Sequence, residues 1–262
     1  MSFMKILTSL LFTLFLITGA RAALQEKPVI YQHDGATFEG LHVYDDALSG
    51  KRPAVLVIHQ WTGLGEHEKS RSRMLAALGY NVFAADIYGQ GIRPQPPEAG
   101  KEAGKYKTDR KLYRARLTAA LDWLKADEHT DGKKIAAIGF CFGGTGVLEL
   151  ARSGADIAGV VSFHGGLDAA AGMTAETGKI PAKVLVLHGA EDPYVPAEQV
   201  AAFEKEMTGA QADWQLVHYG GAVHAFTQKE AGNDNRKGAA YNEAADRRSW
   251  ASMQAFFVEL FK

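Results

Sequence analysis

The order of apolar and polar residues predicts a chain in which strands alternate with helices. Apolar runs typical of strands covered on both faces occupy residues 54–58, 81–85, 135–138, 157–163, 182–188 and 214–219. Between them, apolar residues recur at helical spacing, as from Tyr113 to Leu124 and around Val200 and Phe203. At the C-terminus, Trp250, Met253, Phe257 and Leu260 fall on one face of a helix. This alternation predicts one α/β domain with a mainly parallel central sheet and helices on both faces.

Two segments depart from the simple alternation. Residues 29–44 read as two strands joined by a turn at His33-Asp34-Gly35, which predicts an antiparallel pair at the sheet edge. Residues 86–105 contain several glycines and prolines and predict a long loop. Loops of this length are more often functional or mobile than merely connecting.

The first 22 residues have the pattern of a secretory signal peptide. Lys5 precedes an apolar run from Ile6 to Ile17, and Ala20-Arg21-Ala22 provides small residues for cleavage after Ala22. The apolar run is shorter than the roughly 20 residues of a membrane span, although a retained anchor is the alternative interpretation. We therefore expect a signal peptide at 1–22, a single domain at 23–262, and a secreted or periplasmic location.

Composition narrows the possible partners. The 262 residues are 47% hydrophobic and 23% charged, which suits one domain with a sizeable core. The net charge of −1 gives no indication of a nucleic-acid or anionic-membrane partner. A single cysteine, Cys141, cannot form an intrachain disulfide. In an exported protein a lone thiol is a liability, so its presence favours a chemical role.

Cys141 lies in a segment that predicts a strand, a tight turn and a helix. The run that ends at Ile138 continues as Gly139-Phe140-Cys141-Phe142-Gly143-Gly144, and Val147, Leu148 and Leu150 follow at helical spacing. Flanking glycines let the backbone fold back and raise the central side chain, as in a nucleophile elbow with cysteine in place of serine. A thiol beside a histidine and a helix N-terminus becomes strongly nucleophilic. The alternative is a buried, inert cysteine.

The carboxyl ends of other strands supply candidate partners for the thiol, because functional groups of an open parallel sheet gather there. Asp192 follows residues 182–188, and His224 follows residues 214–219. Their order predicts nucleophile Cys141, acid Asp192 and base His224, with Glu191 as the rival acid. The backbone N–H groups of Trp61 and Phe142 are the expected oxyanion donors, and His164 is expected to line the pocket. No spacing of histidines and carboxylates predicts a metal site. Six other histidines are expected to be solvated or structural: His33, His42, His67, His129, His188 and His218.

From about Val29 to the C-terminus, these motifs resemble the dienelactone hydrolase family of α/β-hydrolases. The likeness is carried by the segment around Cys141, the turn from Gly189 to Pro193, and Gly221-Ala222-Val223-His224-Ala225-Phe226. The resemblance implies the α/β-hydrolase fold and a cofactor-free hydrolase that opens lactones or cleaves esters. It also implies a thioester acyl-enzyme on Cys141, with His224 first accepting the thiol proton and later activating water.

The sequence differs from the family pattern at positions that bear on the substrate. Family members that act on dienelactone place a glutamate beside the thiol and arginines against the substrate carboxylate. The matching positions here are Gln60, Gln90 and Gln228, with Arg93 as a substitute for one arginine. An amide cannot replace a charge-assisted arginine contact at similar strength, which predicts a neutral or differently shaped ester or lactone.

Aromatic side chains at Trp61, Tyr88 and Phe226 favour an apolar or aromatic substrate, although each could equally belong to the core. We expect a monomer whose partner is a small molecule. Two other interpretations stay open. One is a non-hydrolytic ligand-binding or thiol redox protein on the same fold, and the other is a hydrolase that acts on peptides or thioesters.

Overall fold

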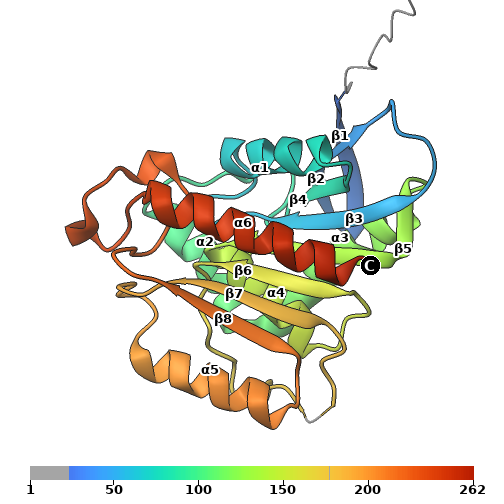
Figure 1. Ribbon diagram of the computed structural model, residues 1–262. Helices are drawn as coiled ribbons and strands as arrows, with labels where there is room; N and C mark the ends of the chain where they lie inside the picture. Colours follow the sequence, from blue (N-terminus) through green and yellow to red (C-terminus); the bar gives the residue numbers. More distant parts are fainter. Residues whose placement is uncertain (1–23, 177) are drawn as a thin grey trace, which may run out of the picture.

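The computed structural model describes residues 24–176 and 178–262. One eight-stranded sheet has the order β1-β2-β4-β3-β5-β6-β7-β8 (Figure 1). The first three strands in this order pair antiparallel and all later pairs are parallel, which confirms the predicted sheet and its N-terminal strand pair. The strands are β1 (Leu24–His33), β2 (Ala36–Asp45), β3 (Arg52–Ile58), β4 (Asn81–Ala85), β5 (Thr130–Phe140), β6 (Gly159–Phe163), β7 (Lys183–Gly189) and β8 (Trp214–Tyr219).

Helices cover both faces of the sheet and bury two separate apolar cores. One core joins the sheet to α2, α3, α4 and α5, and the other joins it to α1 and α6. Figure 1 shows α6 crossing in front of the strands and α4 behind them. The α-helices are α1 (Glu66–Ala77), α2 (Glu98–Thr108), α3 (Arg110–Ala126), α4 (Phe142–Arg152), α5 (Ala197–Gly209) and α6 (Glu243–Leu260), and short 3-10 turns span Lys229–Ala231 and Asn235–Lys237.

The prediction of a loop over residues 86–105 is wrong in its second half, where α2 begins at Glu98. Ala99, Ala103 and Tyr106 are buried against the core from one side of this helix. Gly100 and Gly104 lie inside it, and tertiary packing outweighs their low helix propensity. Only residues 86–97 therefore form the connection from β4 to α2.

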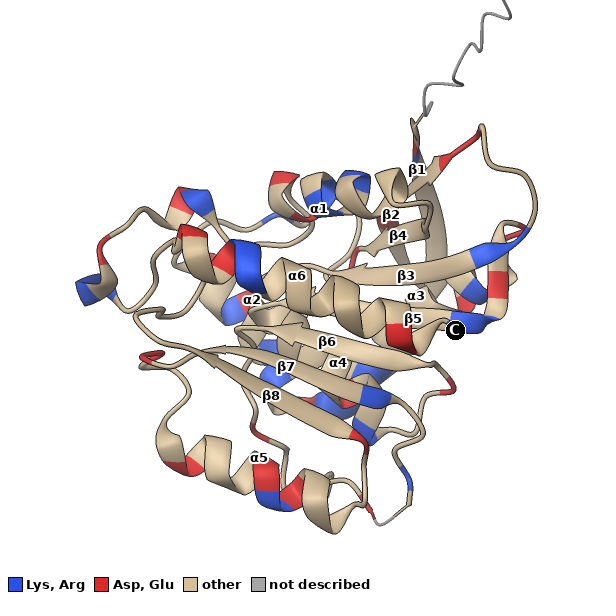
Figure 2. Cartoon of the chain, in the orientation of Figure 1, with Lys and Arg blue, Asp and Glu red and all other residues tan. Residues whose placement is uncertain are grey.

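Charges are mixed over the surface. Figure 2 shows basic and acidic residues close together on α1, α5 and α6, whereas most of the sheet is uncharged. Within the described ranges, every helix is too short or too polar to cross a bilayer. The predicted signal peptide at 1–22 lies outside the described residues and stays a prediction.

Candidate active site

Cys141 occupies a strained turn between β5 and α4. Its φ of 54° lies in a region that residues with a Cβ rarely adopt. The neighbouring backbone leaves no space for side chains: a Cβ on Gly139 would lie 2.0 Å from the Gly143 oxygen, and one on Gly143 would lie 2.3 Å from the Ile58 oxygen. The glycines are therefore required by close packing, as the predicted nucleophile elbow demands.

Loops after β7 and β8 bring two polar side chains to the thiol. His224 Nε2 lies 3.0 Å from Cys141 Sγ, and His224 Nδ1 lies 2.8 Å from Asp192 Oδ2. The Asp192 side chain is fully buried, while Cys141 is half-buried. Glu191, the rival acid, is exposed and accepts a hydrogen bond from the Gly221 N–H. The structure thus joins Cys141, His224 and Asp192 in one chain of contacts and leaves Glu191 outside it.

Electrostatics in this chain of contacts favour an ion pair. Burial opposes a charge on His224, but the Cys141 sulfur and the Asp192 carboxylate raise its pKa to about 10. Burial would also raise the pKa of the Cys141 thiol, yet the His224 charge, its hydrogen bond and the Phe142 N–H together lower it. These opposite shifts favour a thiolate beside an imidazolium at neutral pH.

The loop after β3 holds the second expected oxyanion donor. The Gln60 carbonyl accepts hydrogen bonds from His59 Nδ1, at 2.6 Å, and from the Gly63 N–H, at 3.1 Å. The Trp61 carbonyl accepts the Tyr88 hydroxyl at 2.8 Å. The Trp61 N–H itself donates to no residue in the described part of the chain, as an oxyanion donor requires.

His164, which we expected to line the pocket, lies against the backbone of Cys141. It is fully buried, and its Nδ1 lies 3.2 Å from the Cys141 backbone N–H, which must be the donor. Nδ1 is therefore unprotonated, and Nε2–H donates to Thr227 Oγ1 at 2.8 Å. Burial lowers the pKa of His164 well below its ordinary value, consistent with a neutral ring.

Other predicted pocket residues divide between the core and the surface of the site. Phe226 is fully buried with its ring 5.0 Å from that of His164, and Tyr88 is buried against His59 and Phe142, so both belong to the core. Gln60 and Trp61 are half-buried. The structure thus shows a packing role for Phe226 and Tyr88, and their contact with substrate stays a prediction.

The structure also shows where Arg93, Gln90 and Gln228 lie. Arg93 donates from Nε to the Leu64 carbonyl and from Nη1 to Asp86 and nearby carbonyls, so its guanidinium holds loops together and is not brought to Cys141. Gln90 is exposed and contacts Glu39. Gln228 is buried, and its Nε2 has no hydrogen-bond partner among the described residues.

Sequence reasoning missed two residues that hold the oxyanion loop, His59 and Glu68. His59 Nε2 accepts the Ile87 N–H, so the ring proton lies on Nδ1 and is donated to Gln60. Glu68 is fully buried on α1 and accepts the N–H groups of Gln60 and Gly65. The position of His59 directly after a buried strand could have marked it as a site residue. Nothing in the sequence of the polar helix α1 distinguishes Glu68 in the same way.

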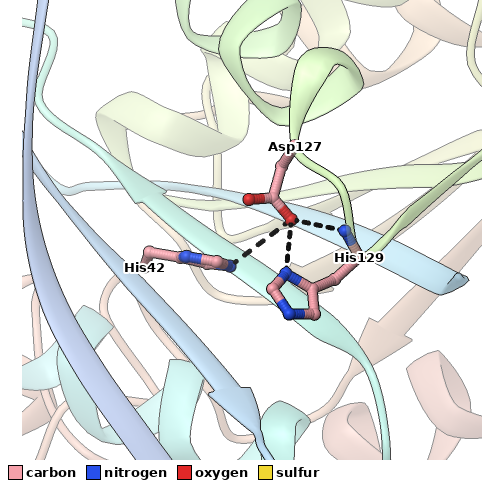
Figure 3. Close-up of side chains that lie close together, drawn as sticks. All are labelled: His42, Asp127 and His129. Atoms are coloured by element: carbon pink, nitrogen blue, oxygen red, sulfur yellow. Dashed lines mark hydrogen bonds and ion pairs between the residues drawn. The ribbon is translucent and has the colours of Figure 1, made fainter. Parts of the chain in front are cut away.

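The structure also brings together His42, Asp127 and His129, which are residues that could hold a metal ion (Figure 3). His129 Nδ1 and His42 Nε2 lie 3.2 Å and 3.8 Å from Asp127 Oδ1. Asn81 Nδ2 donates to the same oxygen, and Asn81 Oδ1 accepts from His42 Nε2 at 2.7 Å. Because these hydrogen bonds already use the facing ring nitrogens, they account for the cluster as a link from β2 and β4 to the turn before β5.

Comparisons with known proteins identify the family and the fold. The model of the dienelactone hydrolase family matches residues 38–261. A crystal structure of a dienelactone hydrolase-like promiscuous phosphotriesterase from metagenomic libraries superimposes with a TM-score of 0.86 at 41% identity, covering 91% of this chain and 99% of that one.

Curated relatives include an uncharacterised protein of Caenorhabditis elegans, 37% identical over 56% of this chain and 92% of its own. A putative carboxymethylenebutenolidase of Synechocystis is 28% identical over 79% of this chain and 86% of its own. On the match over residues 38–261, together with the shared α/β-hydrolase fold, the chain belongs to the dienelactone hydrolase family of hydrolases.

Proposed function

We propose that this hydrolase cleaves carboxylic esters or lactones through a thioester on Cys141. The observation that carries the proposal is the continuous contact from Cys141 Sγ through His224 to the buried Asp192 carboxylate. Such an arrangement supplies a nucleophile, a base that can also act as an acid, and a group that orients the base. No step in this scheme needs a cofactor.

In the first half-reaction, the Cys141 thiolate attacks the carbonyl carbon and a C–S bond forms. The carbonyl oxygen takes the electron pair and is stabilised by the N–H groups of Trp61 and Phe142. Collapse of this intermediate breaks the C–O bond of the ester, and His224 Nε2–H protonates the departing alkoxide. A thioester and a neutral His224 remain.

In the second half-reaction, neutral His224 removes a proton from water, whose oxygen attacks the thioester carbonyl. The C–S bond then breaks, which releases the carboxylic acid and restores the thiolate and imidazolium. Asp192 stays ionised and keeps the His224 ring in position throughout. For a lactone, the alcohol and acid remain parts of one product.

The substrate that fits this chain best is a neutral or differently shaped ester or lactone without the carboxylate of dienelactone. Gln60 and Gln90 supply amides where family members that act on dienelactone carry charged groups, and Arg93 is bound to its own loops. Binding of a substrate carboxylate would therefore lack a free arginine from these positions. We expect weak turnover of dienelactone compared with neutral esters.

A second candidate activity is phosphotriester hydrolysis, because the similar chain at 41% identity is described as a promiscuous phosphotriesterase. The same thiolate would attack phosphorus in place of carbon, an S–P bond would form as the P–O bond to the leaving group breaks, and the leaving group would take the His224 proton. Neutral His224 would then activate water to cleave the S–P bond, which restores the thiolate and releases the phosphodiester. Paraoxon therefore belongs in the substrate panel beside the esters.

The test is hydrolysis of p-nitrophenyl esters and simple lactones before and after treatment with iodoacetamide, with Cys141→Ala alongside. Loss of activity in the alkylated protein and in the variant is expected. Full esterase activity in Cys141→Ala would refute the mechanism, and labelling of Cys141 without turnover would favour a binding or redox protein. Export with cleavage after Ala22 is a separate proposal that N-terminal sequencing of the secreted protein tests.

A further inference from the structure

Glu68 is a buried carboxylate that the reaction scheme does not use. It lies in the first turn of α1 and is fully buried, although a glutamate is almost never buried without a partner. No lysine or arginine pairs with it among the described residues. Its burial must therefore be stabilised by the neutral groups that it contacts.

Those groups are two backbone N–H donors of the loop that carries Trp61. Glu68 Oε2 accepts the Gly65 N–H at 3.0 Å, and Oε1 accepts the Gln60 N–H at 3.2 Å. The contact with Gly65, three residues earlier, is the usual bond by which a glutamate caps the start of its own helix. The contact with Gln60 lies outside the helix, and capping does not require it.

The contact with Gln60 bears directly on the oxyanion donor. Glu68 holds the N–H of Gln60, while His59 Nδ1 and the Gly63 N–H hold its carbonyl oxygen. Because the peptide bond is planar and trans, fixing the Gln60 carbonyl also fixes the direction of the Trp61 N–H on the opposite side. Glu68 holds the preceding peptide, His59–Gln60, whose N–H it accepts, whereas the carbonyl contacts hold the Gln60–Trp61 peptide itself. Fixing both peptides restricts rotation about the Gln60 backbone bonds, the rotation that would turn the Trp61 N–H away from the substrate.

We propose that Glu68 is a positioning residue for the oxyanion hole, acting through the Gln60 backbone to orient the Trp61 N–H. This role rests on the proposed hydrolysis at Cys141. It predicts a specific kinetic signature, because Glu68 would assist stabilisation of the oxyanion and take no part in forming the thiolate. The His224–Cys141 contact lies on other loops and does not include Glu68.

The experiment compares the wild type with Glu68→Gln, which keeps the shape but replaces one carboxylate acceptor with an NH₂ group that faces an N–H. The rates are compared at a pH above the raised pKa of Glu68, which is about 7, so that the wild type carries the carboxylate. We expect kcat for a p-nitrophenyl ester to fall by about 10–100-fold, less than the roughly 100–1,000-fold cost of removing an oxyanion donor outright, because the Trp61 N–H is misdirected and not deleted. The rate of Cys141 alkylation by iodoacetamide should stay within about twofold, because displacement at a saturated carbon forms no oxyanion. The preference for an ester over the matching thionoester should also narrow, since sulfur accepts hydrogen bonds poorly.

Glu66→Gln is the matched control, because Glu66 lies on the same turn of α1 but is exposed and pairs with Arg73. It should leave every rate unchanged. Where Glu68→Gln fails to fold, Glu68→Asp keeps the charge with a shorter reach, and the same loss of kcat with unchanged alkylation is expected.

The outcomes separate the two proposals. An active wild type whose kcat is unaltered by Glu68→Gln and Glu68→Asp overturns the positioning role alone. Equal losses of hydrolysis and alkylation also overturn it, because they would place the effect on the thiolate. If the wild type shows no turnover that requires Cys141, the proposed function and this inference are overturned together.

Discussion

Replacing Asp192 with asparagine tests the ion pair at the centre of the site. The Asp192 carboxylate is fully buried and lies 2.8 Å from His224 Nδ1. Asparagine preserves the size of the side chain but removes the charge that stabilises the imidazolium. The pKa of His224 should therefore fall, and the pKa of the Cys141 thiol should rise because the imidazolium is lost.

The expected size of the change follows from the single charged hydrogen bond that is weakened. Such a bond contributes about 1.5–3 kcal/mol, and each pKa unit corresponds to about 1.4 kcal/mol, so the thiol pKa should rise by about one to two units. At a pH below the wild-type thiol pKa, the thiolate fraction then falls by about 10–100-fold. Hydrolysis should fall further, by up to about 10⁴-fold, if asparagine also selects the wrong His224 tautomer.

The assay is the pH dependence of Cys141 alkylation by iodoacetamide, followed by mass spectrometry, beside kcat/KM for a p-nitrophenyl ester. Glu191→Gln is the matched control, because Glu191 is the adjacent acid but is exposed and does not contact His224. An unchanged alkylation profile in Asp192→Asn would show that the carboxylate does not sustain the ion pair. A profile shifted equally by Glu191→Gln would refute the assignment of Asp192.

Three further predictions concern the frame around the site. Gly143→Ala should remove activity and lower the free energy of unfolding by about 3 kcal/mol or more, as measured by urea denaturation, since its Cβ would lie 2.3 Å from the Ile58 oxygen; a stable, active variant would contradict the close packing. Asn81→Ala should lower the free energy of unfolding by about 2–3 kcal/mol in the same assay, because Asp127, Thr130 and His42 lose a buried hydrogen-bond partner. A decrease below about 0.5 kcal/mol would show that the cluster in Figure 3 adds little to stability. Burial raises the folded-state pKa of Glu68 to about 7, above its ordinary value of 4.5, so its contribution to stability is full below pH 4.5 and is lost as the pH rises through 7. Relative to Glu68→Gln, the wild type should therefore lose stability as the pH rises from 4.5 to about 7, and parallel stability profiles would contradict this.

Local patterns were sufficient to predict the sheet and the chain of contacts from Cys141. Continuous apolar runs marked the central strands, because both of their faces are covered. The carboxyl-end rule then selected Asp192 and His224, which the structure joins with Cys141 in one chain of contacts. These features succeed because each is encoded over a few neighbouring residues.

Features that depend on tertiary packing could not be predicted in the same way. α2 contains two glycines, and only its contact with the core explains why they are helical. His164 follows a strand end, as a pocket residue would. Its side chain instead lies on the buried side of Cys141, and this placement depends on the backbone turn at φ 40° and on the fold, which the sequence pattern does not reveal. The role of Glu68 likewise depends on where the loop from β3 passes over α1.

The single cysteine at the elbow also limits how long each molecule can remain active. A thiolate is the form of cysteine that peroxides attack, and a half-buried one is accessible to them. The chain contains no second cysteine that could convert the resulting sulfenic acid into an intramolecular disulfide. Further oxidation to the sulfinic acid would be permanent. The charge pair that makes the sulfur reactive toward substrates in the proposed mechanism therefore also makes the protein's working lifetime a function of the oxidants around it.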